Sequence, residues 1–172
     1  MLAASSQGTY DVLVAFHVVA AVVGFGSVAI SGVYGASARR LSARTDDELR
    51  ARTRYGQERP ERVEEIRRYF RGRSLAEYLI VIAPFFGAAA LASRPGHHGF
   101  GSLWVVAGEI IWVVASALLL LVVRPAEGAI RRAAGAGDLD AARAPGRRLM
   151  WASVVTDVLF VIALAFMVTQ PR

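Results

Sequence analysis

The chain of 172 residues contains no cysteine. This absence excludes disulfide bridges, thioether attachment of a c-type haem, thiolate metal sites and a cysteine nucleophile. Any bound metal or cofactor must therefore be held by nitrogen or oxygen atoms. Lysine is absent as well, so all twenty basic residues are arginine.

The sequence motifs of familiar enzyme classes are also missing. The chain has no nucleophilic triad, phosphate-binding loop, pair of catalytic carboxylates or zinc-binding helix motif. The glycines of Gly24-Phe25-Gly26 follow no predicted strand and lack a third glycine, so they do not form a dinucleotide fingerprint. The sequence therefore makes no positive case for an enzyme.

Apolar residues, by contrast, are abundant, at 55% of the chain. The hydrocarbon core of a bilayer is about 30 Å thick and takes about 20 apolar residues of helix to cross. Four segments meet that length, namely residues 12–34, 75–92, 103–123 and 149–169. We therefore predict an all-α fold, a four-span transmembrane helix bundle that forms a single domain over residues 1–172.

The arginines are unevenly distributed along the chain. Twelve lie between Arg39 and Arg73 and six between Arg124 and Arg148. By the positive-inside rule these two segments are cytoplasmic, which predicts a multi-pass plasma-membrane protein with both termini outside. The net charge of +6 is then explained by topology and by attraction to anionic lipid, and not by nucleic acid.

The first arginine-rich segment also has an apolar pattern. Pro60 suits the first position of a helix, in which Val63, Ile66 and Phe70 fall on one side among arginines. This pattern predicts a cytoplasmic amphipathic helix between the first two spans, lying on the inner membrane surface with its apolar side in lipid. Docking of a partner protein on this helix is the alternative.

The first span carries a stripe of small residues, which consists of Ala20, Gly24, Ser27, Ser31 and Gly35. Such stripes let helices approach closely in lipid, so the stripe is interpreted as a packing face. His17 lies two turns before Gly24 on the same side and should point into the bundle.

Two features mark the second span. Ser74-Leu75-Ala76-Glu77 has the form of a capping box, so Glu77 is expected to cap the helix. Pro84 lies in mid-span, where it should kink the helix and free a backbone carbonyl inside the bundle.

Three ionisable residues lie within the apolar runs: His17, Glu109 and Asp157. Such residues are costly at membrane depth and mark candidate functional sites. With a rise of 1.5 Å per residue, His17 and Glu109 both lie roughly 8 to 10 Å below the outer boundary and could touch. Asp157 lies roughly 10 Å farther inward, so direct contact with His17 is not expected.

Further polar residues surround these three. Trp112 shares a helix face with Glu109, and Ser153 lies four residues before Asp157. Ser27 is close in depth to Asp157 and could donate a hydrogen bond to it. The turn after the second span holds two more histidines, His97 and His98, which could fold down toward His17.

Several interpretations of these residues stay open. His17 and Glu109 could simply satisfy one another. Alternatively, His17 ligates haem b or a divalent metal, with Glu109, Trp112, His97 and His98 as neighbours or further ligands. Glu109 and Asp157 could instead line a proton or cation path in a small transporter or assembly subunit, and a membrane scaffold without cofactor remains the plainest alternative. A homo-oligomer is compatible with each of these.

The stretch Phe16-His17-Val18-Val19-Ala20-Ala21-Val22-Val23-Gly24-Phe25-Gly26 resembles the opening of several small bacterial membrane families. These are the copper-resistance D-type proteins, the haem-carrying membrane protoporphyrinogen oxidase and a family of predicted integral membrane proteins of unknown function. The closing residues 163–171 make the last family the most similar. The resemblance implies a four-helix bundle in which His17 is a haem or metal ligand.

Overall fold

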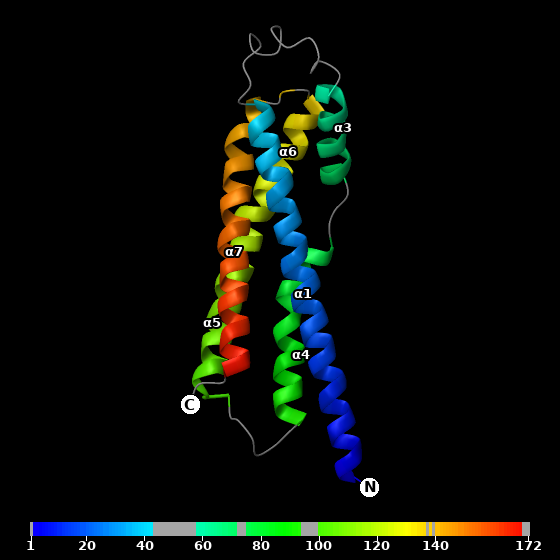
Figure 1. Cartoon of the computed structure of the whole chain (residues 1–172), viewed down its shortest axis with the longest axis vertical. Helices are drawn as coiled ribbons and strands as arrows, with labels where there is room; N and C mark the ends of the chain where they lie inside the picture. The colour runs from blue at the N-terminus through cyan, green and yellow to red at the C-terminus, as the bar shows by residue number, and fades with distance from the viewer. Residues whose placement is uncertain are drawn as a thin grey trace. The chain divides into compact units, whose positions relative to one another are not determined.

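The computed structural model describes residues 2–42, 58–71, 75–93, 100–136, 138 and 140–169. Every regular element among them is helical, which confirms the predicted all-α class (Figure 1). The α-helices are α1 (Leu2–Ser42), α3 (Glu58–Arg71), α4 (Leu79–Ser93), α5 (Leu103–Leu118), α6 (Arg124–Ala136) and α7 (Arg143–Thr169). Short 3₁₀ turns, Ala76–Tyr78 and Asp140–Ala142, precede α4 and α7, and a π-helical turn, Leu119–Val123, joins α5 to α6.

Four helical segments are long and apolar enough to cross a membrane. They are Gln7–Arg40, Ala76–Ser93, Leu103–Ala136 and Asp140–Thr169, and each contains one of the predicted spans or nearly all of it. Large apolar side chains on their surfaces are exposed, among them Val33, Leu121 and Val168. Such exposed apolar surface is typical of helices that face acyl chains.

The third of these segments is longer than the sequence predicts. Helix continues beyond Val123, where the predicted span ends, to Ala136. In the π turn the N–H of Arg124 donates to the carbonyl of Leu119, five residues back, and this register suits Pro125, which has no N–H to donate. Alanine favours the helix intrinsically, and Ile130 is fully buried on its inner face.

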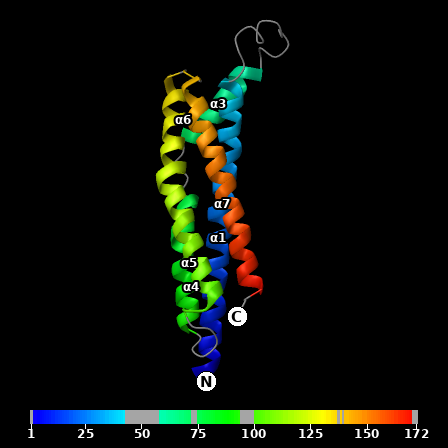
Figure 2. The same cartoon turned by 90° about the vertical axis from the view of Figure 1, so that its left-hand side faces the viewer.

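The described residues form two compact units, and each is considered by itself. Unit 1 comprises residues 1–27, 75–117 and 156–172. In it α1 and α4 approach closely, since a Cβ on Gly24 would lie 2.7 Å from the backbone nitrogen of Ile80. Phe25 of α1 also stacks on Phe160 of α7, with ring centroids 4.5 Å apart. Figure 2 shows α4 running beside α1 and α5.

Unit 2 comprises residues 28–74 and 118–155. In it α1 meets α7 at two glycines, since a Cβ on Gly146 would lie 2.7 Å from the carbonyl oxygen of Gly35. A Cβ on Gly32 would similarly lie 2.5 Å from the Cβ of Ser153. Ala20, Gly24, Ser31 and Gly35 of the predicted stripe are all buried, which confirms that these small residues of the first span form a packing face.

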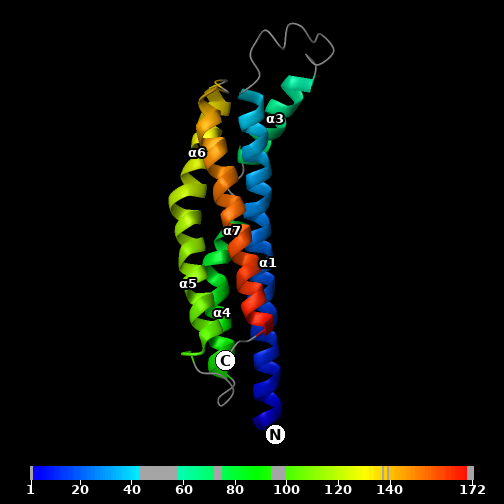
Figure 3. The same cartoon turned by 60° about the vertical axis from the view of Figure 1, so that its left-hand side comes forward.

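Helix α3 is the predicted helix around Pro60, and within unit 2 it packs on α1 and α6 (Figure 3). Ile66 and Phe70 are only 3% and 4% exposed, and the Tyr69 ring stacks on Tyr34 of α1 with centroids 3.9 Å apart. These apolar side chains therefore contact protein, whereas the sequence predicts that they face lipid. The side chain of Val63 lies outside the described residues.

Candidate functional site

His17 is positioned by a hydrogen bond to the backbone of a neighbouring helix. Its ring is partly buried in unit 1, and Nδ1 lies 2.7 Å from the carbonyl oxygen of Ala83 in α4. A carbonyl can only accept a hydrogen bond, so Nδ1 must carry the proton. In the neutral imidazole the lone pair is then on Nε2. This second ring nitrogen has no hydrogen bond with a described residue, and its lone pair can serve as the donor to a ligand.

A glycine on α4 makes room for this ring. Gly87 lies one turn after Ala83, and a Cβ there would be 3.0 Å from both Nδ1 and Cε1 of His17. Such a distance is tighter than most Cβ contacts in proteins, so over any other residue type the imidazole would have to move by a few tenths of an ångström. Beside this contact Phe16 stacks on Phe86, with centroids 5.5 Å apart, which holds the same two helices together.

The structure does not bring Glu109 to His17. Glu109 is exposed on α5 and, among the described residues, has no hydrogen bond or ion pair. The hydrogen-bond partner of His17 is the Ala83 carbonyl instead. Equal depth in two helices is necessary for contact, but the rotation of each helix about its axis decides which side chains meet.

Trp112 contacts α4 and not the His17 ring. Its indole lies edge-on to Phe85, with centroids 6.1 Å apart, whereas the α1 ring Phe16 stacks on the next residue, Phe86. The indole Nε1 of Trp112 and the hydroxyl of Ser116 are buried and have no hydrogen-bond partner within the described part of the chain. Unsatisfied buried donors are uncommon in native proteins, so this face of α5 is a second polar feature of unit 1.

The other predicted polar residues are separate from this site. Asp157 is partly buried in α7 and has no hydrogen bond or ion pair to any described residue, Ser27 included. Ser153 is buried and donates to the carbonyl of Leu149 at 3.0 Å, one turn back in its own helix. His97 and His98 lie outside the described residues. No group of three His, Asp or Glu side chains that could hold a metal ion occurs among the residues described.

Comparison with protein-family models, with curated proteins and with solved structures finds no match for this chain. The kinship that residues 16–26 suggest therefore stays a prediction. Function has to be argued from the geometry of the residues themselves.

Sequence reasoning missed a polar cluster in unit 2 that joins α1, α3 and α6. The hydroxyl of Ser31, which is fully buried, donates to Oε1 of Glu127 at 2.8 Å. Because that hydroxyl has a single proton, the Tyr69 hydroxyl, 2.8 Å away, must be the donor to Ser31. Oε2 of Glu127 pairs with Nη1 of Arg124 at 3.5 Å.

The sequence carried only a faint signal for this cluster. Arg124 and Glu127 are three residues apart, the spacing of a helical ion pair, but they lie beyond the predicted third span, in the second arginine-rich segment. Ser31 belongs to the small-residue stripe, which by itself indicates packing only.

The predicted cap Glu77 is also fully buried, in the 3₁₀ turn before α4, and Ser74 of the same capping box lies outside the described residues.

Proposed function

We propose that the protein is an integral membrane protein that binds haem b through Nε2 of His17. The hydrogen bond from Nδ1 to the Ala83 carbonyl carries this proposal. Histidines that ligate metals almost always donate their other ring N–H to a carbonyl or carboxylate, which sets the tautomer and the ring orientation. Here the backbone of α4 provides that acceptor.

The donor set favours haem over a bare divalent metal. A divalent ion needs several protein ligands, and the described residues contain no cluster of three. The porphyrin supplies four nitrogens to its iron, so one imidazole is sufficient. The faces of a porphyrin are apolar, and Phe16, next to His17, is 55% exposed on the surface that acyl chains would cover. When bound, haem would supply one-electron redox chemistry or ligand binding at the iron.

Within this proposal the residues of the chain have distinct tasks. The Ala83 carbonyl accepts the hydrogen bond from Nδ1 of His17 and so selects the tautomer in which the lone pair of the neutral ring is on Nε2. Gly87 allows the ring to approach α4. The stacked pair Phe16 and Phe86 fixes α1 against α4 at the same level.

An absorption spectrum tests the proposal directly. The protein is expressed with ample haem and purified in detergent. Its absorption is then measured over the range in which haem absorbs, roughly 350 to 600 nm. We expect a Soret band in the wild type and no band in His17→Asn, whose amide nitrogen replaces Nδ1 and can still donate to the Ala83 carbonyl, which preserves packing. The matched control, His97→Ala with His98→Ala, should keep the band. Colourless wild-type protein, or an unchanged band in His17→Asn, would contradict haem binding at His17.

The topology that accompanies this proposal has the arginine-bearing segments in the cytoplasm and both termini outside. It is supported by the placement of Arg39 and Arg40 at the end of α1 and of Arg143 at the start of α7. His17, in the first half of α1, would then lie nearer the outer face.

A second candidate function rests on the two carboxylates, Glu109 and Asp157. Both lie in membrane-spanning segments, and neither has a hydrogen bond or ion pair with a described residue. An unpaired carboxylate at membrane depth is costly unless it takes a proton or a cation, which favours a proton or cation path. Proton-linked uptake into liposomes would be reduced in Glu109→Gln or Asp157→Asn under this hypothesis, and unchanged flux in both variants would remove its basis.

A further inference from the structure

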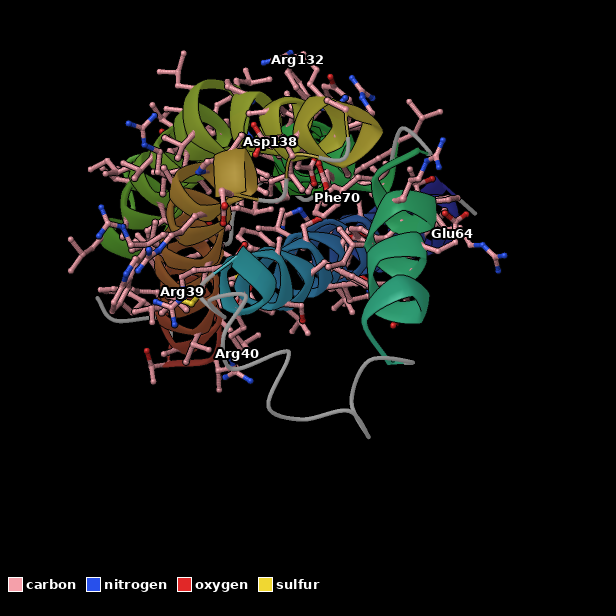
Figure 4. All side chains as sticks on the ribbon, turned by 90° about the horizontal axis from the view of Figure 1, so that it is seen from above. Arg39, Arg40, Glu64, Phe70, Arg132 and Asp138 are labelled. Carbon is pink, nitrogen blue, oxygen red and sulfur yellow. The ribbon has the colours of Figure 1, made fainter. Side chains whose placement is uncertain are left out.

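Arginines of two spanning helices gather at one point in unit 2. A Cβ on Gly146 of α7 would lie 2.7 Å from the Gly35 carbonyl oxygen and 3.2 Å from the backbone nitrogen of Arg39, so the two backbones are in contact. Around that contact lies what we call the α1–α7 arginine cluster, which consists of Arg39, Arg40, Arg143 and Arg147. Figure 4 shows Arg39 and Arg40 at the end of α1, where it meets α7.

Most of this cluster lacks acidic partners. Arg40, Arg143 and Arg147 are exposed and have no ion pair or hydrogen bond with any residue that the structure describes. Asp138, one of two acids that closely precede Arg143 and Arg147 in the chain, instead accepts the backbone N–H of Ala141 at 3.1 Å.

Other arginines of unit 2 form ion pairs with acidic residues of their own helix. Arg67 and Arg68 both pair with Glu64, and Arg124 pairs with Glu127. Three of the four arginines of the α1–α7 arginine cluster, Arg40, Arg143 and Arg147, therefore carry a positive charge that no described carboxylate neutralises. Positive charges on both sides of one backbone contact attract an anion.

The surface next to the cluster has the shape of a lipid site. Arg147, Trp151 and Val154 follow each other at i, i+4 and i+7 along α7, so they lie on one face. Trp151 is 59% exposed and Val154 45% exposed, and tryptophan is typical of the level between headgroups and acyl chains. An arginine thus lies directly above an exposed apolar stripe.

We propose that the α1–α7 arginine cluster binds the phosphate of an anionic phospholipid whose acyl chain lies along Trp151 and Val154. The planar guanidinium group matches two phosphate oxygens at once, which the fork of donors on Arg143 and Arg147 provides. An anionic phospholipid combines a phosphate with an apolar tail. The α7 face offers arginines for the phosphate and exposed apolar side chains for the tail. This site is independent of any ligand at His17.

Lipid retention measured by native mass spectrometry tests the site. The protein is reconstituted in vesicles of phosphatidylglycerol and phosphatidylcholine in equal amounts, extracted in mild detergent, and the bound lipids are counted. We expect the wild type to retain phosphatidylglycerol preferentially. In Arg143→Gln with Arg147→Gln that preference should fall roughly twenty-five-fold, since each arginine near an anionic surface contributes about fivefold.

A matched control removes the same charge elsewhere. Arg131 and Arg132 of α6 are also exposed and have no partner among the described residues, so Arg131→Gln with Arg132→Gln should leave the preference unchanged. Equal loss in both double variants would show general electrostatic attraction and overturn the site, as would absence of preference in the wild type.

A final arm distinguishes lipid from a soluble anion. Inorganic phosphate is added to protein in phosphatidylcholine vesicles, and thermal unfolding is compared with that in vesicles containing phosphatidylglycerol. Stabilisation by phosphatidylglycerol alone supports the lipid site, whereas equal stabilisation by inorganic phosphate would assign the cluster to a soluble anion. Thermal unfolding of both double variants also confirms that each is folded.

Discussion

The ring of His17 is placed by two neighbours that contribute only backbone. The Ala83 carbonyl, 2.7 Å away, accepts from Nδ1, and Gly87 has no side chain to exclude the imidazole. Together they fix which ring nitrogen is protonated and where the other one lies. A residue-scale change at Gly87 should therefore act on His17 without altering any polar group.

We predict that Gly87→Ala displaces the imidazole. The new methyl group would be 3.0 Å from two ring atoms, and overpacking of this kind costs about 1–3 kcal/mol. Thermal unfolding in detergent should show the loss in stability, and any Soret band should weaken. Gly108→Ala is the control, because a Cβ there has no neighbour within 4 Å, and alanine gains up to about 1 kcal/mol over glycine in a helix. Equal effects of the two substitutions would contradict the close contact at Gly87.

Side-chain partners were the least predictable part of the site. Depth along a helix can be counted from the sequence, and it placed His17 level with Glu109. Contact also requires that both side chains point at one another, and Glu109 is exposed on its own helix. The actual acceptor, a backbone carbonyl, occurs at every residue and so leaves no mark in the sequence.

At the scale of elements, α3 is held on α1 and α6 by packing and by hydrogen bonds together. Phe70 is 4% exposed, its ring lies edge-on to Tyr69 with centroids 5.0 Å apart, and the Tyr69 hydroxyl bonds to Ser31 of α1. Helix periodicity in the sequence predicts α3 and its apolar side. Whether that side meets lipid or protein depends on the partner surfaces of α1 and α6, which lie far away in the chain.

We predict that Phe70→Ala releases α3 from α1 and α6. Truncating a buried phenylalanine typically costs about 3–5 kcal/mol, and here the loss falls on one helix. Hydrogen exchange of the backbone amides of 64–70 should accelerate, while exchange in α4 should not change. Arg68→Ala is the control, because that side chain is 77% exposed and makes only an i,i+4 pair with Glu64. Unchanged exchange in Phe70→Ala would show that α3 is held by other contacts.

The continuation of the third apolar segment through α6 is another element-scale difference. Its charged residues, Arg124, Glu127, Arg131 and Arg132, lower the hydropathy, so a span prediction ends where the leucines and valines end. The helix persists because the π turn absorbs Pro125 and because Ile130 is buried. Hydropathy therefore locates the apolar segment, but it does not determine the end of the helix.

At the scale of the whole molecule, the absence of cysteine allows a clean test of topology. We predict that Gln7→Cys reacts with a membrane-impermeant maleimide in intact cells, because the N-terminus is expected outside. Ala136→Cys, at the end of α6 next to the second arginine-rich segment, should react only after the cells are permeabilised. Both positions are exposed, and the wild-type chain provides a background without label. The reverse labelling pattern would invert the predicted orientation.

The sequence by itself determined the helical class and the positions of four apolar helices, because hydropathy and helix propensity add up along a single segment. Only the tertiary structure decided which groups meet: the Ala83 carbonyl at His17, Glu127 and Tyr69 at Ser31, and arginines of α1 and α7 around Gly35 and Gly146. These contacts depend on how each helix is rotated and how closely glycines let two backbones approach. Both are properties of pairs of segments that are distant in the chain.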